Sequence, residues 1–154
     1  MAPVLKPAEM RAWRAFLDAQ ASLLRRLGAD LVKHEDITLA EYDVLVQLNF
    51  APDGQLRMSG LSDRVRLSPS GLTRLVDRLV RSGLVKRGRC ASDRRGTNAI
   101  LTAAGRARLR RASPVHLRGI REYFSGRLSA TQLEAVAEAL EPLGRDMPLG
   151  VSSD

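Results

Sequence analysis

Two short helical patterns separated by only two residues constrain the fold of this chain more than any other feature. In the first, residues 59–66, Ser59 is placed to cap a helix. The second, residues 69–82, begins with Ser68 as a hydroxyl cap and Pro69 at the first helical position, where the missing N–H of proline costs nothing. A tight connection between two helices is typical of a helix-turn-helix unit.

The helix predicted for residues 69–82 has two dissimilar faces. Its apolar positions recur at steps of three and four, and they are Leu72, Leu75, Val76, Leu79 and Val80. The opposite stripe consists of Ser70, Thr73, Arg74, Asp77, Arg78 and Arg81. Short hydroxyl residues are able to approach base edges in a major groove, and arginines behind them reach guanines or phosphates. Taken alone, the stripe is equally compatible with a solvated surface helix.

The segment that follows favours the nucleic-acid interpretation. Two β-prone stretches, residues 84–89 and 97–101, are joined by a polar, arginine-rich loop, which predicts a β-hairpin. Arg94 and Arg95 at its tip suit a narrow, electronegative minor groove. Asp93 has the wrong charge for a DNA contact, so we interpret it as a brace that accepts hydrogen bonds from nearby arginines.

The excess positive charge of the chain is concentrated in one quarter of its length. Residues 57–95 contain eleven basic and three acidic residues, which equals the net charge of +8 of the whole chain. The fourteen basic residues elsewhere are balanced by fourteen acidic ones. A solvated surface would spread its charges, so this window predicts a face that binds a polyanion. Composition alone leaves DNA and RNA open.

Long amphipathic helices are predicted on both sides of this basic segment. Apolar residues recur at helical spacing over residues 8–32, up to the polar run at 33–36. Thr38 with Glu41, three residues on, predicts a capping box that starts the next helix. Residues 52–54 predict a turn after that helix. Further start signals are the cap Thr102 and the capping box of Ser129 with Gln132. The helix after Thr102 should reach about Gly126, with a bend at Pro114.

The predicted fold is therefore mainly α with a small β-hairpin wing. Residues 38–102 form a winged helix-turn-helix lobe, residues 8–36 and 103–147 form dimerisation helices, and residues 148–154 form a disordered tail. The first helix carries more apolar surface than the basic lobe offers to cover, so a second chain is the simplest partner. The alternative is that the terminal helices fold back on their own lobe. Leu133, Val136 and Leu140 are the predicted dimerisation residues.

The sequence offers little for chemistry or membranes. It contains no phosphate-binding glycine loop, no nucleophile motif and no His, Cys and carboxylate spacing for a metal, so we expect no enzyme activity, cofactor or metal. His34 is better explained as a solvated helix end. The single cysteine, Cys90, forms no internal disulfide and has an alternative interpretation as a redox switch. No apolar run of 18 residues occurs, and we expect a cytoplasmic protein that does not bind membranes.

Three passages resemble the MarR family of bacterial regulators: "LSPSGLTRLVDRLVRSGLVKR" at residues 67–87, "SDRRGTNAILTAAGR" at 92–106, and the flanking long helices. In that family the D-x-R of the wing is followed by a strand and then L-T-x-x-G. Those places are filled here by Asp93, Arg95, Leu101, Thr102 and Gly105. The resemblance implies a homodimer with intertwined terminal helices, in which each lobe reads one half of an inverted-repeat operator in double-stranded DNA.

The resemblance also implies positions for the site residues. The residues expected to contact DNA are Ser70, Thr73, Arg74 and Arg78 in the major groove, Arg94 and Arg95 in the minor groove, and Ser68 at the start of the same helix. Such proteins commonly bind small aromatic acids, for which Trp13, Arg14 and Tyr42 are candidate residues. The leading hypothesis is a dimeric repressor relieved by a small aromatic or phenolic ligand. The alternative is a winged-helix architectural or protein-interaction module without sequence specificity.

Overall fold

The computed structural model describes residues 4–65, 67–90 and 93–146 of the 154-residue chain. Six of them are described by their backbone alone: Cys90, Asp93, Arg94, Arg95, Arg145 and Asp146. The tail predicted for residues 148–154 lies outside this part of the chain.

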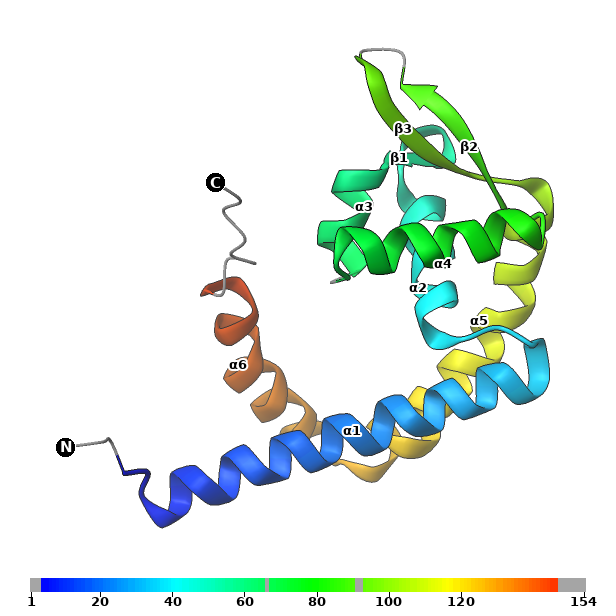
Figure 1. The fold of residues 1–154 in the computed structure, drawn as a ribbon. Coiled ribbons are helices and arrows are strands. Elements are labelled where there is room, and N and C mark those ends of the chain that lie inside the picture. The colour runs from blue at the N-terminus through cyan, green and yellow to red at the C-terminus, as the bar shows by residue number, and fades with distance from the viewer. Residues whose placement is uncertain (1–3, 66, 91–92, 147–154) are drawn as a thin grey trace.

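The predicted fold class is confirmed: a winged helix-turn-helix lobe stands beside long helices (Figure 1). The helices are α1 Pro7–Glu35, α2 Leu39–Phe50, α3 Met58–Val65, α4 Pro69–Arg81, α5 Ala103–Tyr123 and α6 Ala130–Asp146. The strands are β1 Gln55–Arg57, β2 Val85–Cys90 and β3 Asp93–Leu101, and short 3-10 turns cover Pro52–Gly54 and Ser125–Arg127. We call the part from α2 to β3 the lobe, the β2–β3 hairpin the wing, and α1, α5 and α6 the frame.

Both predicted capping boxes are present. The amide of Glu41 donates to Thr38 Oγ1 at 3.2 Å, and Glu41 Oε2 accepts from the amide of Thr38 at 2.9 Å. The amide of Gln132 donates to Ser129 Oγ at 3.2 Å, and Gln132 Oε1 accepts from the amide of Ser129 at 2.9 Å. These reciprocal bonds satisfy backbone donors that a helix leaves free, and they begin α2 and α6 at the predicted residues.

The core of the lobe is aliphatic and lies where α2, α3 and α4 meet the foot of the wing. Its members with 2% exposure or less include Val44, Leu45, Leu48, Leu61, Leu72, Leu75, Val76, Leu79, Val85 and Ala99. Burying one such side chain contributes about 1.5–3 kcal/mol. The lobe therefore holds α4 by one full face.

Helix α1 is longer than its apolar pattern predicts. It continues through the polar run to Glu35 and ends at Asp36, whose φ of 50° is left-handed. Arg108 on α5 donates through Nη1 to the carbonyl oxygen of Glu35 at 2.8 Å and to that of Asp36 at 3.3 Å. The free carbonyl groups at the end of α1 are thus satisfied by a residue more than seventy positions away. The spacing of apolar residues cannot predict such a contact.

The wing departs from the prediction in two ways. Residues 93–96, predicted as loop, belong to β3, so that only residues 91–92 separate the two strands. The backbone hydrogen bonds between β2 and β3 continue beyond the apolar part of the strands. A hydropathy pattern cannot predict pairing between polar residues. The short strand β1 was not predicted. It pairs antiparallel with β3, with Leu56 opposite Ala99, and it makes a three-stranded sheet.

Other boundaries shift by a few residues. Helix α3 starts at Met58, so Ser59 lies inside it and is not its cap. Helix α5 runs through Pro114 without interruption and ends at Tyr123, where a 3-10 turn replaces the predicted last turn. None of the described helices combines the length and apolarity required to cross a membrane.

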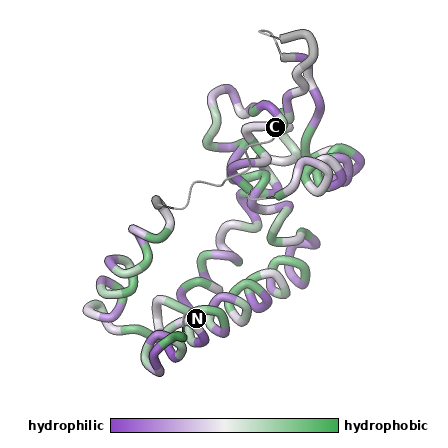
Figure 2. Tube along the Cα trace, turned by 60° about the vertical axis from the view of Figure 1, so that its left-hand side comes forward, coloured by the Kyte–Doolittle hydropathy of each residue, from purple (hydrophilic) through white to green (hydrophobic). Residues whose placement is uncertain are grey.

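The frame helices α1 and α5 lie side by side, and α6 rises from their far end and stands apart from the lobe (Figures 1 and 2). Leu27 of α1 is buried against α5, where a Cβ atom on Gly119 would lie only 2.7 Å from Leu27 Cδ2. Tyr123 donates to Asp30 Oδ2 at 2.7 Å across the same contact. Apolar side chains on the frame nevertheless remain exposed: Trp13, Phe16, Leu17, Leu24, Val32, Leu117, Leu140 and Leu143.

Candidate nucleic-acid interface

Helix α4 presents the polar stripe that its sequence predicts. Ser68 caps the helix by accepting a hydrogen bond from the amide of Gly71 at 3.1 Å, and Pro69 occupies the first turn. The apolar face is buried except for Val80, which is 36% exposed at its edge. The residues left exposed are Ser68, Ser70, Thr73, Arg74, Arg78 and Arg81. Over 13 residues α4 is about 20 Å long. Its diameter with side chains, about 10–12 Å, fits a major groove about 12 Å wide.

The hydroxyl groups at the start of α4 are partly occupied by their own helix. Thr73 Oγ1 donates to the carbonyl oxygen of Pro69 at 2.9 Å, and Ser68 Oγ lies 3.4 Å from Ser70 Oγ. These bonds fix where the oxygens sit. They leave lone pairs on the exposed side, where a base amino group or a water molecule could donate to them.

The turn between α3 and α4 depends on a residue that sequence reasoning missed. Ser62 is the buried polar side chain of the lobe, 7% exposed, and its hydroxyl donates to the carbonyl oxygen of Leu67 at 2.6 Å. This bond closes the helix-turn-helix connection from inside. A serine at an apolar position of α3, just before the turn, was the available signal.

The foot of the wing explains why Thr102 and Gly105 stand where they do. Thr102 Oγ1 donates to the carbonyl oxygens of Gly83 and Leu84, at 2.7 and 3.0 Å, and it accepts from the amide of Gly105 at 3.0 Å. Gly83 has a φ of 73°, the left-handed conformation in which glycine commonly follows the end of a helix. A Cβ atom on Gly105 would collide with the carbonyl oxygen of Leu84. One threonine hydroxyl therefore joins the end of α4, the wing and the start of α5.

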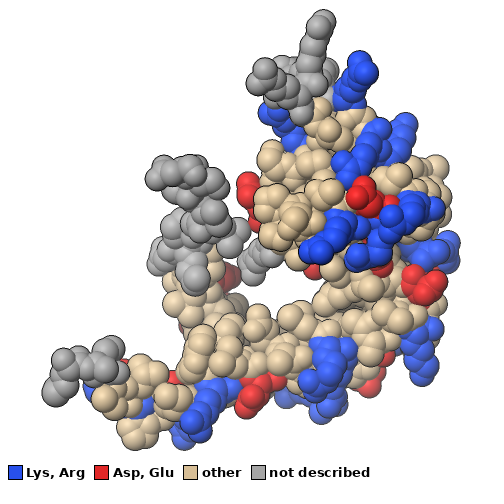
Figure 3. Space-filling model, viewed as in Figure 1, with Lys and Arg blue, Asp and Glu red and all other residues tan. Residues whose placement is uncertain are grey.

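Basic side chains gather over α4 and the wing, with acidic side chains among them (Figure 3). Two of the acids are engaged by arginines: Arg87 Nη2 lies 2.8 Å from Asp77 Oδ1, and Arg78 Nε lies 3.4 Å from Glu41 Oε1. A polar cavity of about 420 Å³ opens between α4 and the wing, lined by Arg57, Met58, Ser59, Thr73, Arg87, Gly96 and Thr97. Its lining thus brings residues of β1 and α3 together with residues of α4 and the wing.

The wing residues of the predicted site are located by backbone only. Asp93 pairs with Cys90 at the outer end of the hairpin, and Arg94 and Arg95 follow in β3. Their side chains, and the thiol of Cys90, lie outside what the structure describes. The predicted brace of Asp93 and the minor-groove contacts therefore stay predictions.

The three residues predicted to bind an effector are not brought together within one chain. Trp13 is 52% exposed near the start of α1, where its ring stacks on Phe16 with centroids 6.1 Å apart. Arg14 follows it on the same helix and is also exposed. Tyr42 is buried in the lobe, with its ring centroid 4.6 Å from that of His116. Trp13 lies more than 20 residues before the end of α1, which is about 30 Å along the helix.

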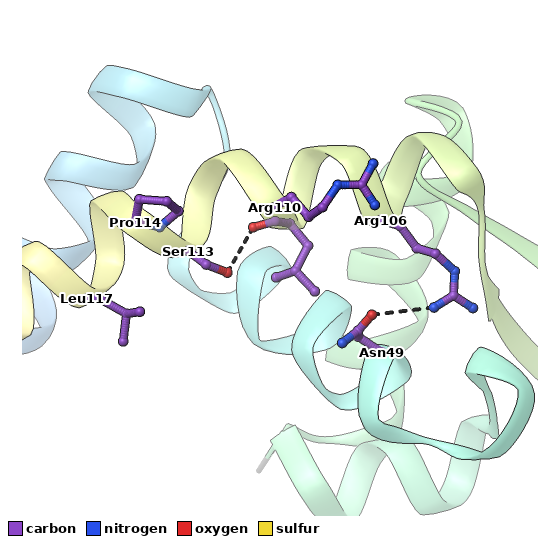
Figure 4. Close-up of a pocket in the computed structure, with 7 residues that line it drawn as sticks. Asn49, Arg106, Arg110, Ser113, Pro114 and Leu117 are labelled. Atoms are coloured by element: carbon purple, nitrogen blue, oxygen red, sulfur yellow. Dashed lines mark hydrogen bonds between the residues drawn. The ribbon is translucent and has the colours of Figure 1, made fainter.

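A cavity of about 500 Å³ lies elsewhere, between the C-terminal end of α2 and α5 (Figure 4). It is lined by Asn49, Arg106, Leu109, Arg110, Ser113, Pro114 and Leu117. Arg106 donates to Asn49 Oδ1 at 3.4 Å across its mouth. His34 is not in either cavity; its Nδ1 lies 2.9 Å from the carbonyl oxygen of Asp30, one turn earlier in α1. No cluster of three metal-ligating side chains occurs in the described ranges.

Comparison with known proteins decides the family. Residues 35–96 match the model of the MarR family. AbsC, a MarR family transcriptional regulator from Streptomyces coelicolor, is 32% identical with a TM-score of 0.87, over 94% of this chain and 97% of AbsC. The chain belongs to the MarR family of transcriptional regulators.

Two further MarR-family structures were solved with DNA. Sco3205 from Streptomyces coelicolor, in complex with DNA, is 30% identical with a TM-score of 0.91, over 99% of this chain and 97% of that one. A cysteine-to-serine mutant of MarR from E. coli, complexed with operator DNA, is 25% identical with a TM-score of 0.79, over 92% and 99% of the two chains. The resemblance inferred from the wing and α4 motifs is thus confirmed.

Proposed function

We propose that this MarR-family regulator binds an inverted-repeat operator as a symmetric dimer and represses transcription until a small aromatic or phenolic ligand releases it. The observation that carries the proposal is the exposed stripe of α4 beside the wing. In this arrangement Ser70, Thr73 and Arg74 face base edges of the major groove. Ser68 and Arg78 contact the backbone, and the wing residues Arg94 and Arg95, braced by Asp93, enter the minor groove.

The dimer is supported by the frame. In one chain α6 lies apart from the lobe, with Leu140 and Leu143 exposed by 40% and 62%, and Leu133 and Val136 are only half-buried. The apolar side chains of Trp13, Phe16, Leu17 and Leu24 on α1 are exposed as well. Exposed apolar area of this extent on a single chain is typical of an association surface. A two-fold pair of chains would carry two copies of α4, as an inverted repeat requires.

Ligand control is supported by the cavity between α2 and α5. The lining combines two arginines, Arg106 and Arg110, with the apolar Leu109 and Pro114, a combination suited to the carboxylate and ring of an aromatic acid. The cavity joins a helix of the lobe to a helix of the frame. Occupancy there would favour one orientation of the lobe over another.

Selection from a random-sequence duplex pool tests the proposal. The purified full chain should enrich a sequence made of two inverted half-sites about one helical turn apart, and it should bind that duplex at least about 10³-fold more tightly than a scrambled one at the same salt concentration. Adding benzoate should then release the selected duplex. Enrichment of no sequence, with equal affinity for all duplexes, would support the architectural module instead.

A further inference from the structure

We propose that Glu41, at the start of α2, is a positioning residue for DNA recognition: it holds Arg78 of α4 in one orientation while leaving the end of the guanidinium free for DNA. This inference rests on the proposed function, because it assumes that α4 contacts DNA. It assigns a role to an acidic side chain that neither touches DNA nor belongs to the basic face.

The two carboxylate oxygens of Glu41 have separate partners. Oε2 accepts from the amide and the hydroxyl of Thr38, both at 2.9 Å, and so completes the capping box of α2. Oε1 faces Arg78 Nε at 3.4 Å. The side chain of Glu41 is 16% exposed, whereas that of Arg78 is 50% exposed. A carboxylate fixed by two cap bonds therefore serves as a rigid anchor for a mobile arginine.

The nitrogen that Glu41 engages decides what the pair does. The guanidinium group has five N–H donors, and Nε supplies only the one nearest the stem. Among the described residues the side chain of Arg78 has no other hydrogen-bond or ion-pair partner, so both terminal nitrogens remain available. A bond at Nε restricts the rotation of the side chain without occupying the donors that would bind a phosphate or a guanine.

The pair on the neighbouring residue of α4 differs in this respect. Arg87 uses a terminal nitrogen, Nη2, to contact Asp77 at 2.8 Å. That contact occupies part of the fork that DNA would use. The two acids should therefore act in opposite directions: Asp77 competes with DNA for its arginine, and Glu41 prepares its arginine for DNA.

Stability does not account for the pair with Arg78. An exposed ion pair contributes little to folding, and the cap needs a hydrogen-bond acceptor but no charge, since glutamine serves in capping boxes as well. An additional negative charge next to a DNA-binding helix opposes binding electrostatically. The gain that offsets this cost is orientation, because ordering a long side chain on binding is itself unfavourable.

The test is Glu41→Gln, which retains the cap and its shape and removes the charge. Binding to the selected operator should weaken about two- to tenfold per half-site, which is the cost of ordering one long side chain. Binding to scrambled DNA should stay equal or tighten slightly. Asp63→Asn is the matched control, because it removes one exposed acid of the same lobe. The carboxylate of Asp63 has no hydrogen-bond or ion-pair partner among the described residues, so its loss should only tighten binding to both duplexes slightly.

A double-mutant cycle separates positioning from a structural effect. In an Arg78→Ala background, Glu41→Gln should no longer weaken operator binding, because the residue that it positions is gone; only the slight tightening from the lost negative charge should remain. An equal loss in both backgrounds would mean that Glu41 acts through the fold of α2. Unchanged or tighter operator binding by the single variant would overturn the proposal as well.

NMR of the arginine Nε–H groups tests the same point without DNA. The cross-peak that disappears in Arg78→Ala should show a high heteronuclear NOE in the wild type and a reduced one in Glu41→Gln. An unchanged NOE would overturn the proposal even if either variant bound DNA poorly. Failure of the wild type to select any operator would instead refute the proposed function, and the NMR comparison would still decide whether Glu41 orders Arg78.

Discussion

Arg87 on β2 and Asp77 on α4 form an ion pair, with 2.8 Å between Arg87 Nη2 and Asp77 Oδ1, that connects the wing to α4. Both side chains are substantially exposed, at 35% and 45%, so the pair contributes at most about 1 kcal/mol to folding. Asp77→Asn should leave the denaturation midpoint nearly unchanged. It should tighten binding to operator and scrambled duplexes alike, because Arg87 is released for a phosphate.

Salt titration checks this prediction. One more phosphate contact per chain should steepen the slope of log affinity against log salt concentration by about 0.9 per chain. A weaker affinity of Asp77→Asn for both duplexes would mean that the pair serves to hold the wing in place and does not compete with DNA.

Gly105→Ala should destabilise the lobe. The added methyl group would collide with the carbonyl oxygen of Leu84, a backbone atom that cannot rotate away, and overpacking of this kind costs about 1–3 kcal/mol. Urea denaturation gives the free energy of unfolding. Gly60→Ala is the control, since a Cβ atom there meets nothing within 4 Å inside α3, and it should stabilise the protein by about 0.5–1 kcal/mol.

Arg74→Ala and Arg95→Ala should weaken DNA binding in different ways. Losing a base contact from α4 should cost about 1–3 kcal/mol per half-site and relax the preference at one base position. Losing an arginine of the wing should weaken operator and scrambled duplexes more evenly, because minor-groove arginines respond to shape and charge. Competition titrations with single-base operator variants measure both effects. Equal losses on all duplexes for Arg74→Ala would place this residue on the backbone.

Substitution of Leu140 and Leu143 by glutamate tests the dimer. Both side chains are exposed in one chain, so a monomeric protein would tolerate the change. A dimer that buries them should dissociate, lose operator binding and elute as a monomer in light-scattering chromatography. A double substitution of the exposed Ala135 and Glu138 of α6, both to glutamine, controls for changes in the helix itself.

Stability should decrease as the pH falls below about 6.5. Burial lowers the pKa of His116 below its ordinary value of 6.5, and the charge of Asp43 opposes that shift. The unfolded chain then binds more protons than the folded one in this range, so acidification favours unfolding. The free energy of unfolding, measured in urea between pH 7.5 and 5.5, should decline, and His116→Gln should flatten the decline.

Asp43 has the opposite sign, and its effect appears when the series is extended from pH 5.5 toward pH 4. Burial raises the pKa of its carboxyl above the ordinary 3.8, so that the folded state takes up this proton more readily than the unfolded one. Its contribution to stability therefore grows as the pH falls. Asp43→Asn should accordingly steepen the loss of stability on acidification, whereas a shallower loss would contradict this account of the pair.

How much the sequence predicts depends on whether the responsible interaction is local. Ser68 with Pro69, and Thr38 with Glu41, start their helices because each cap reaches only three residues along the chain. The hydropathic stripe of α4 likewise predicts its buried face, because a helix that packs against one core has one apolar side.

The missed features depend on partners that are distant in the chain. The end of α1 is satisfied by Arg108, and β1 exists because β3 pairs with it. The pair of Glu41 and Arg78 joins residues 37 positions apart. Charge counting assigned Arg78 to the basic face without finding the acid that restrains it, since a one-dimensional pattern contains no distances.

Helix α5 begins under the wing at Thr102 and ends against α1 at Tyr123. It is one uninterrupted rod of 21 residues, about 30 Å long. Tilting a helix of this length by about 3° at one end moves the other end by about 1.6 Å. A shift of that size is enough to make or break a hydrogen bond. A small movement of α5 against α1 would therefore reach the foot of the wing at the other end of the same helix.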